Sequence, residues 1–235
     1  MIQVQRAKER YAANHGWLKA RFSFSFAEYY DPNYMEFGPM RVLNDDIIQP
    51  MRGFGTHPHK EMEIVTVVLD GYLKHEDSTG ETATTTFGGI QRMTAGTGVM
   101  HSEVNPSPDQ QVNLLQMWFF PDEQGLQPSY ENTNFNIEAM KNNLLPVVRK
   151  GSDRDDVAKI HQDLTIYLSD LEEEEQLTFS QDEGRKIFVF VIEGSITLND
   201  ATNLDRRDSA RITDTANLTI EATEDARFML IDLPK

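Results

Sequence analysis

GFGTHPHKEMEIVTVVLDG, residues 53–71, is the most informative segment of the chain. It passes from a glycine-rich start through two histidines into the apolar run IVTVVL (64–69) and then into the turn Asp70-Gly71. β-Branched residues favour strands, and an acidic residue followed by glycine is typical of a tight hairpin turn. We therefore predict a strand that ends in a hairpin. Similar runs predict four further strands: LLQMWFF (114–120), KIFVFVI (186–192), SITL (195–198) and RFMLIDL (227–233).

The residue pattern of this segment recurs in the second half of the chain. IVTVVLDGYLKHED and IFVFVIEGSITLND both consist of an apolar run, an acidic-Gly turn and a second strand. We predict an all-β protein made of two antiparallel β-barrels of the jelly-roll (double-stranded β-helix) type, with few short helices. The expected domains are residues 1–130 and 131–235. The polar, proline-punctuated segment 121–157 is expected to cross between them, with a short helix near residues 137–143.

The composition excludes several classes of protein. No run of 18 consecutive apolar residues occurs, and the opening MIQVQRAKER lacks the apolar part of a secretory signal, so we expect a cytoplasmic protein that does not enter a membrane. The net charge of −16 argues against a nucleic-acid partner, because phosphate binding requires clustered Lys and Arg. The chain has no cysteine, so a bound metal must be held by nitrogen and oxygen ligands.

Two pairs of candidate metal ligands lie near glycine-rich turns. His57 and His59 are two residues apart, and in AGTGVMHSEVNP the residues His101 and Glu103 repeat this spacing. Residues i and i+2 of a strand point to the same face, so two neighbouring strands would direct three nitrogens and a carboxylate to one point. One such pair arises easily by chance, whereas two pairs favour a site for one divalent transition metal. Glu63 shares the face of His57 and His59 in a regular strand, and spacing does not choose between Glu63 and Glu103.

No comparable set occurs in the second half of the chain. When the two acidic-Gly turns are aligned, the positions that correspond to the first histidine pair and to Glu63 hold other residues: Ser180, Asp182 and Lys186. No histidine follows His161, so the second domain is predicted to be a degenerate scaffold without metal ligands. The three single histidines are expected to have surface or hydrogen-bonded structural roles: His15, His75 and His161.

The ligand segments resemble the two signature motifs of the cupin superfamily. Three positions fit the first motif: His57, His59 and Glu63. In that motif Gly71 comes one residue late, and Met51 stands where the leading glycine is expected. Three positions fit the second motif: Gly98, His101 and Asn105. There Gly96 replaces a proline, and the gap after Gly89 is one residue longer.

Within the cupins the chain resembles the bacterial pirin-like proteins. The resemblance is carried by NHGWLKARFSFSFAEYYDPNYMEFGPMRVLNDD, GFGTHPHKEMEIVTVVLDG, HEDSTG and TAGTGVMHSEVNP, and more weakly by KIHQDLTIYL. It implies that the four metal ligands of the family fall on His57, His59, His101 and Glu103, and that Glu63 is their neighbour. Pirins bind iron, so the resemblance implies Fe(II), with Mn, Co, Ni, Cu or Zn as metals that the same ligand set suits.

The resemblance also implies an activity. Several bacterial pirins are described as quercetin 2,3-dioxygenases, which open the central ring of a flavonol with O2 and release carbon monoxide. In this chain Glu103 would be the catalytic base that takes the proton of the flavonol 3-hydroxyl. The pocket for such a flat substrate is expected to be lined by Phe54, Met62 and Met117. The alternative is a non-catalytic, redox-sensitive iron protein that regulates a protein partner, since animal pirin acts in this way on transcription factors.

Overall fold

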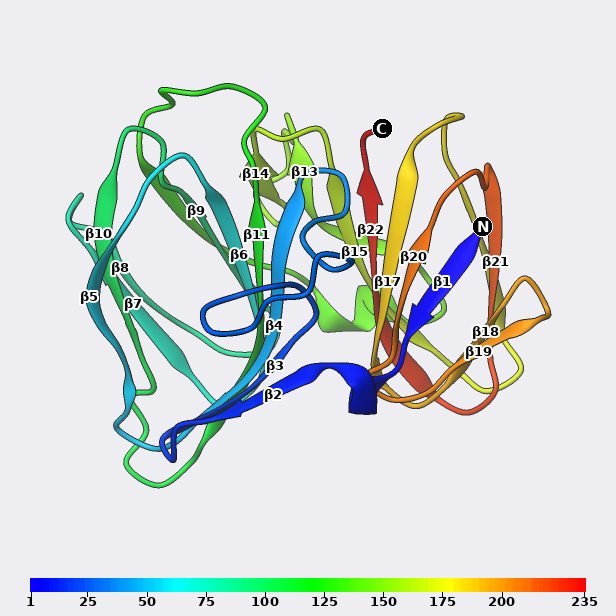
Figure 1. The fold of residues 1–235 in the computed structure, drawn as a ribbon, viewed down its shortest axis with the longest axis horizontal. Helices are drawn as coiled ribbons and strands as arrows, with labels where there is room; N and C mark the ends of the chain where they lie inside the picture. Colours follow the sequence, from blue (N-terminus) through cyan, green and yellow to red (C-terminus); the bar gives the residue numbers. More distant parts are fainter. The chain divides into compact units, whose positions relative to one another are not determined.

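The computed structural model describes residues 1–235, and nearly all of its regular structure is β-strand. The chain forms two compact units, each built from separate segments (Figure 1). Unit 1 comprises Met1–Arg10, Asn136–Arg149 and Asp163–Lys235, and unit 2 comprises Tyr11–Phe135 and Lys150–Gln162. The units therefore differ from the continuous domains 1–130 and 131–235 expected from the repeat. One reason is that β1 (Ile2–Gln5) pairs with β20 (Ser209–Ile212), which places the start of the chain in unit 1.

Unit 2 contains two antiparallel sheets. The larger sheet has the strand order β12-β9-β6-β11-β4-β3-β2, and the smaller has the order β5-β10-β7-β8. The larger sheet consists of β2 Tyr11–Asn14, β3 Leu18–Phe22, β4 Met40–Ile48, β6 Glu63–Asp70, β9 Gly89–Thr94, β11 Val112–Phe119 and β12 Ser129–Asn134. The smaller sheet consists of β5 Gly53–His59, β7 Leu73–Asp77, β8 Thr82–Thr85 and β10 Val99–Val104. The short strand β14 (Ala158–Ile160) also belongs to unit 2.

An apolar cluster joins the two sheets of unit 2. Leu18 of β3, Ile48 of β4 and Leu114 of β11 are buried together with Leu73 of β7, which belongs to the smaller sheet. Burying a side chain of this size contributes about 1.5–3 kcal/mol. Side chains alternate between the two faces of a strand, so the alternate residues that continue along β4 and β11 point into the space between the sheets.

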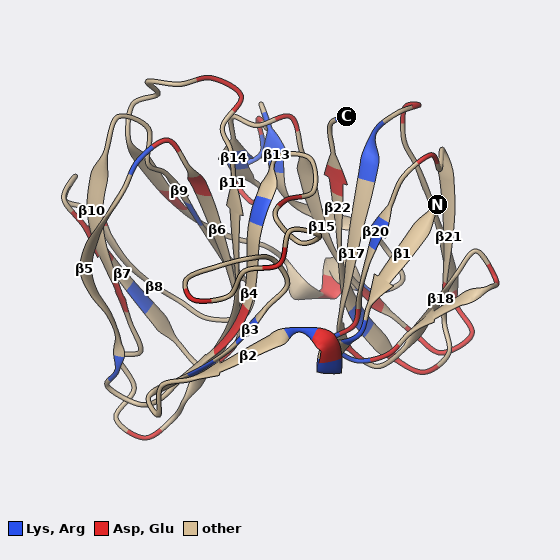
Figure 2. Ribbon diagram, in the orientation of Figure 1, with Lys and Arg blue, Asp and Glu red and all other residues tan.

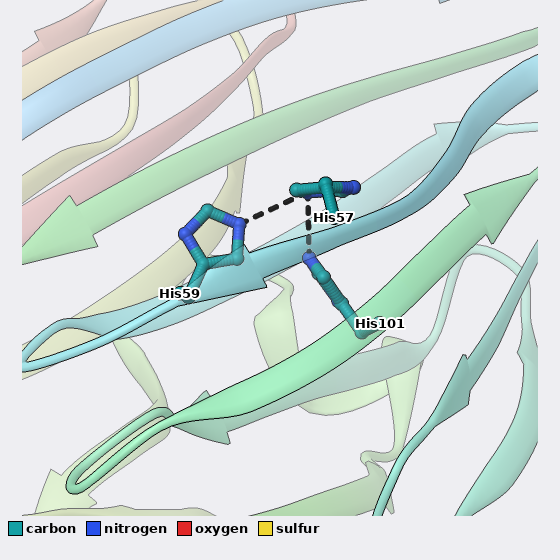
Figure 3. Close-up of side chains that lie close together, drawn as sticks. All are labelled: His57, His59 and His101. Atoms are coloured by element: carbon teal, nitrogen blue, oxygen red, sulfur yellow. Dashed lines mark hydrogen bonds between the residues drawn. The ribbon is translucent and has the colours of Figure 1, made fainter.

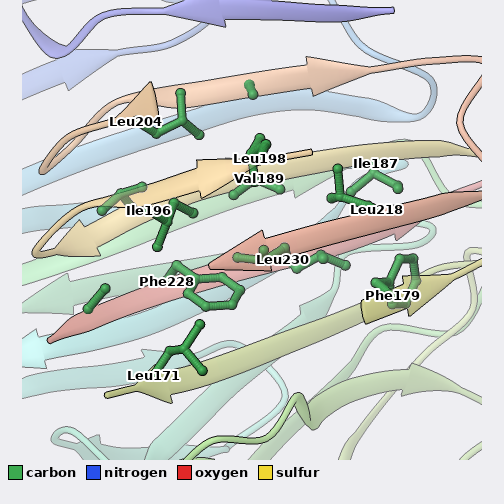
Figure 4. Packing of buried hydrophobic residues seen from close by; sticks show 14 of the residues in the cluster. Leu171, Phe179, Ile187, Val189, Ile196, Leu198, Leu204, Leu218, Phe228 and Leu230 are labelled. Atoms are coloured by element: carbon green, nitrogen blue, oxygen red, sulfur yellow. The ribbon is translucent and has the colours of Figure 1, made fainter. Parts of the chain in front are cut away.

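Unit 1 has the same two-sheet construction, with the strand orders β1-β20-β17-β22-β15-β13 and β16-β21-β18-β19. The first sheet also contains β13 Leu145–Lys150, β15 Thr165–Leu171, β17 Lys186–Glu193 and β22 Ala226–Leu233. The second contains β16 Gln176–Ser180, β18 Ile196–Leu198, β19 Thr202–Leu204 and β21 Asn217–Ala222. Figure 4 shows the cluster between these sheets, which includes Phe228 of the first sheet and Phe179 and Leu204 of the second. This cluster forms an apolar core between the two sheets of unit 1.

The predicted all-β fold with few helices is confirmed, and each predicted strand falls on an observed one: β6, β11, β17, β18 and β22. Closed barrels are not confirmed, because the strands of each unit form two separate hydrogen-bonded sheets. The helix expected near residues 137–143 is the shorter 3₁₀ helix η2 (Ile137–Met140), and a second one is η1 (Ala7–Glu9). The expected crossing segment 121–157 contains β12 and β13.

Charged residues are distributed over both units. Figure 2 shows Lys and Arg interspersed with Asp and Glu on strands and turns of each unit, rather than collected on one element. Several basic side chains pair with acidic ones within their own unit, as Arg227 does with Asp170 at 2.6 Å and Arg92 with Glu131 at 3.1 Å. None of the helices has the length and apolar character needed to cross a membrane.

Candidate metal centre

The first histidine pair and the second ligand pair lie on neighbouring strands of unit 2. β5 and β10 are antiparallel, and His57 is directly opposite His101. The register shifts between His101 and Glu103, at a point where Gly53 approaches β10 closely. A Cβ atom on Gly53 would lie 2.2 Å from the carbonyl oxygen of Glu103, so only glycine fits there. The glycine and the irregular register therefore bring the two ligand segments together.

Three imidazoles converge in this part of the structure. Figure 3 shows His57 and His59 on β5 and His101 on β10 with their rings directed toward one another. The Nε2 atom of His57 is 3.0 Å from Nε2 of His59 and 3.0 Å from Nε2 of His101. Two metal–nitrogen bonds of about 2.1 Å at a right angle would separate their nitrogens by about 3.0 Å. Both spacings from His57 thus fit neighbouring ligands of one octahedral ion.

The protonation of these rings also suits a metal. His57 Nδ1 is 2.8 Å from the carbonyl oxygen of Gly55, so Nδ1 donates and Nε2 keeps its lone pair for the cluster. Burial, and then the neighbouring imidazoles, lowers the pKa of His59 to about 4 and that of His101 to about 3. Both rings are therefore neutral near pH 7, which is the form that binds metal.

Glu103 lies close to this cluster but belongs to a second group of candidate ligands. Its carboxylate lies with His101 and His75 in a second set, whose candidate ligand atoms are all within 4.8 Å of one another. His101 thus belongs to both sets, while Glu103 does not share one with His57 and His59. Glu103 is buried and accepts a hydrogen bond of 2.7 Å from Gln116 Nε2. Burial raises the pKa of Glu103, and the hydrogen bond from Gln116 offsets only part of this effect.

His75 has a larger role than a single histidine in a strand suggests. Its ring is buried, stacks on Tyr130 at 4.1 Å, and places Nε2 2.9 Å from a carboxylate oxygen of Asp77. The opposite nitrogen, Nδ1, is 3.4 Å from Nδ1 of His101. With Nε2 donating to Asp77, Nδ1 can accept from His101, which leaves His101 Nε2 directed at the cluster. The signal for this role was the i, i+2 spacing of His75 and Asp77 in a predicted strand.

Glu63, the competing carboxylate, is directed away from the cluster. The strand does not continue regularly from His59, because residues 60–62 form a break in which Glu61 has a φ of 51°. β6 then starts at Glu63 in the larger sheet, so the shared face is lost. The buried carboxylate accepts from His161 Nδ1 and from the backbone N–H groups of residues 161 and 162, at 2.9–3.0 Å. Glu63 and His161 are therefore structural partners.

A pocket of about 410 Å³ opens beside the cluster. His57, His59 and Glu103 form part of its lining, and Phe54 lies there as expected. The remaining wall is largely aromatic or apolar, and it includes Trp17, Leu18, Phe22, Phe26 and Trp118. His15 also lines this pocket, 4.0 Å from the carboxylate of Glu28.

The expectation that Met62 and Met117 line this pocket is wrong. Met117 is fully buried on the opposite face of β11 from Gln116 and Trp118. Met62 packs in a different cluster, with Ile64 and Met93. Gln116 was not predicted from the sequence, yet it links two residues of the pocket wall. Its amide donates a hydrogen bond to Glu103 and accepts one of 3.1 Å from Trp118 Nε1.

Comparisons with known proteins agree with these observations. The family model for pirin matches residues 3–119, and a model described as the quercetinase C-terminal cupin domain matches residues 148–233. A quercetin 2,3-dioxygenase of Escherichia coli is 42% identical over 235 residues, which cover 100% of this chain and 99% of that protein. A pirin-like protein of Caulobacter vibrioides is 38% identical over 220 residues, which cover 94% of each chain.

Solved structures extend the likeness to three dimensions. The crystal structure of YhhW from Escherichia coli has a TM-score of 0.94 and 41% identity, and the match covers 100% of this chain and 98% of that one. A second structure, bacterial pirin YhhW in complex with nickel(II), has a TM-score of 0.93 and 40% identity, with 100% and 99% of the two chains covered. The fold is accordingly of the cupin type, and the chain belongs to the pirin family.

Proposed function

We propose that this chain is a metal-dependent dioxygenase that opens the central ring of a flavonol such as quercetin, incorporating both atoms of O2 and releasing carbon monoxide. The observation that carries the proposal is that His57 and His59 belong both to the imidazole cluster and to the wall of an aromatic pocket of about 410 Å³. A pocket of this size with aromatic walls suits a flat aromatic molecule. Relatives named quercetin 2,3-dioxygenase support the same substrate class.

The chain's own residues divide the work of binding and proton transfer. His57, His59 and His101 would hold one divalent ion, and Glu103 would be the fourth ligand on the side that faces the pocket. The bound metal supplies Lewis acidity toward the substrate oxygen and open positions for the reactants. Glu103 takes the proton of the flavonol 3-hydroxyl, and its raised pKa makes its carboxylate a stronger base than an exposed glutamate. Gln116 holds one carboxylate oxygen at 2.7 Å and so fixes the direction of the other.

The metal in this proposal is Fe(II), and other divalent ions with nitrogen and oxygen ligation are substitutes. A nickel(II) complex of a relative supports binding of a divalent ion by this fold. We further propose that the metal chemistry belongs to the region before residue 130, as a cupin barrel, and that the region after it is a cupin scaffold without ligands. Both groups of candidate ligands lie before residue 130, which supports that division.

The test is anaerobic reconstitution with Fe(II), Mn, Co, Ni, Cu or Zn, followed by addition of quercetin in air. Loss of flavonol absorbance that depends on the metal is the expected result, with release of carbon monoxide measured in parallel. Glu103→Gln should lower the rate by about 10²–10⁴-fold, the usual contribution of a general base. The matched control is Glu28→Gln, because Glu28 also lines the pocket but lies beside His15 and outside both ligand sets.

A flat absorbance trace with every metal would overturn the enzymatic proposal. In that case capture of a specific protein partner in only one oxidation state of iron would favour the regulatory function instead. Turnover that persists in Glu103→Gln would support the enzymatic activity but would exclude Glu103 as its catalytic base.

A further inference from the structure

Two polar side chains on β4 are buried in the pocket without a partner in the protein. Asn44 and Asp46 are 3% and 4% exposed, and both line the same cavity as Glu103. The Oδ1 atom of each lacks a hydrogen bond. They are two residues apart, so they lie on the same face of the strand, as does Ile48 in the apolar cluster between the sheets.

The neighbouring polar residues are already engaged. Gln116 is directly opposite Asn44 in the pairing of β11 with β4, but its amide donates to Glu103 and accepts from Trp118. Asp46 is opposite Leu114 on one side and Ala20 on the other, and neither side chain can form a hydrogen bond. Buried polar groups are nearly always paired, and an unpaired one lowers stability. Because both side chains line the pocket, a ligand that enters it can supply a polar partner for them.

The two side chains offer complementary chemistry to such a ligand. Burial, and then the nearby carboxylates Asp45 and Glu103, raises the pKa of Asp46 well above its ordinary value, which favours the protonated carboxyl form that can donate. Asn44 Oδ1 is an acceptor. A hydroxyl group matches either of them, because it accepts through its oxygen and donates through its proton. A negatively charged group would instead meet Glu103 in the same pocket.

We propose that Asn44 and Asp46 form a polar subsite that recognises an uncharged phenolic hydroxyl on an aromatic substrate of this pocket. The inference rests on the proposed function for the class of substrate, and it assigns the two residues to substrate selection rather than to chemistry. Aromatic substrates that lack such a hydroxyl would leave both groups unpaired on binding and would therefore be discriminated against.

The test measures binding without turnover. Ni(II)-loaded protein is titrated anaerobically with quercetin and with the parent flavonol, which lacks quercetin's phenolic hydroxyl groups. Quenching of tryptophan fluorescence reports binding, because both tryptophans of the chain, Trp17 and Trp118, line the pocket. The wild type should prefer quercetin by about tenfold or more, which corresponds to about one satisfied hydrogen bond.

Three variants and one control complete the design. Asp46→Leu and Asn44→Leu should each lose most of this preference while binding the parent flavonol at least as well as the wild type. Asp46→Asn keeps an uncharged hydrogen-bond donor and should retain most of the preference for quercetin. The control is Glu28→Gln, a carboxylate of the same pocket wall that lies beside His15, and it should retain the full preference for quercetin.

The outcomes separate this inference from the proposed function. An equal affinity of the wild type for the two flavonols, or a full preference for quercetin in folded, metal-loaded Asp46→Leu and Asn44→Leu, would overturn the subsite even if quercetin is turned over. If Asp46→Leu does not fold, Asn44→Leu decides the matter by the same criterion. Loss of the preference in the leucine variants would support the subsite, even if no metal gives turnover and the proposed dioxygenase is abandoned.

Discussion

Replacing Asp46 with leucine should make unit 2 more stable. The carboxyl group is 4% exposed, and its Oδ1 atom has no hydrogen-bond partner in the protein. Leaving such a group unsatisfied costs about 1–3 kcal/mol. Leucine is close in size, and Ala20 and Leu114, which are opposite Asp46 on the flanking strands, are apolar. We therefore expect the free energy of unfolding of Asp46→Leu at pH 7 to exceed that of the wild type by about 1–3 kcal/mol.

The assay is urea unfolding of the metal-free protein, followed by tryptophan fluorescence. Trp17 and Trp118 are the only tryptophans of the chain, and both belong to unit 2, so the signal reports on that unit. Asp46→Asn adds a test of the protonation state. The folded pKa of Asp46 is raised, so the stability that its protonated form contributes is present below pH 3.8 and is lost as the pH rises toward the folded pKa.

The asparagine variant does not titrate at this position, so its advantage over the wild type should widen above about pH 4 until the pH reaches the folded pKa of Asp46, at no more than about 1.36 kcal/mol per pH unit. Glu28→Gln, at an exposed carboxylate of the same unit beside His15, is the control. The reasoning is refuted if Asp46→Leu is less stable than the wild type and the stability of Asp46→Asn runs parallel to that of the wild type across this pH range.

Three further perturbations test the surroundings of the centre. Acidifying the metal-free wild type from pH 6.5 to 5 should lower its free energy of unfolding by about 2 kcal/mol through His101. The reason is that the imidazole gains a proton near pH 6.5 in the unfolded chain but only at about pH 3 in the folded one. In urea unfolding, His101→Gln should remove this loss. Gln116→Leu should raise the pKa of Glu103 further, seen as an upward shift of the acid limb in the pH–rate profile for quercetin. Glu63→Gln should lower the free energy of unfolding by about 2 kcal/mol through weakened hydrogen bonds, with metal content unchanged by elemental analysis.

Local sequence signals account for most of the fold. β-Branched runs ending in Asp70-Gly71 and Glu193-Gly194 predicted strands and turns that the structure contains, since both signals act over a few residues. The expectation for Glu63 failed because it assumed a regular strand. A three-residue break after His59 moves the chain into the other sheet, and nothing in Lys60, Glu61 or Met62 announces a positive φ.

The features of the site that were missed depend on pairing between distant segments. His75 approaches His101 because β7 pairs with β10, which places His75 opposite Glu103. Asn44 and Asp46 look like ordinary polar residues in the sequence, and only the folded structure shows that both are buried. Burial also lowers the pKa values of His59 and His101 to about 4 and about 3, so protons would compete with a bound metal at these two imidazoles only well below pH 6.5.

The most direct measurement is the metal stoichiometry of the purified protein after anaerobic titration with Ni(II), by calorimetry and elemental analysis. We predict one ion per chain in the wild type and in His15→Ala, and loss of that ion in His101→Ala and His57→Ala, each checked for folding by circular dichroism. A wild type that takes up no ion, or folded His101→Ala and His57→Ala proteins that bind it as tightly as the wild type, would contradict the assignment of the imidazole cluster as a metal centre.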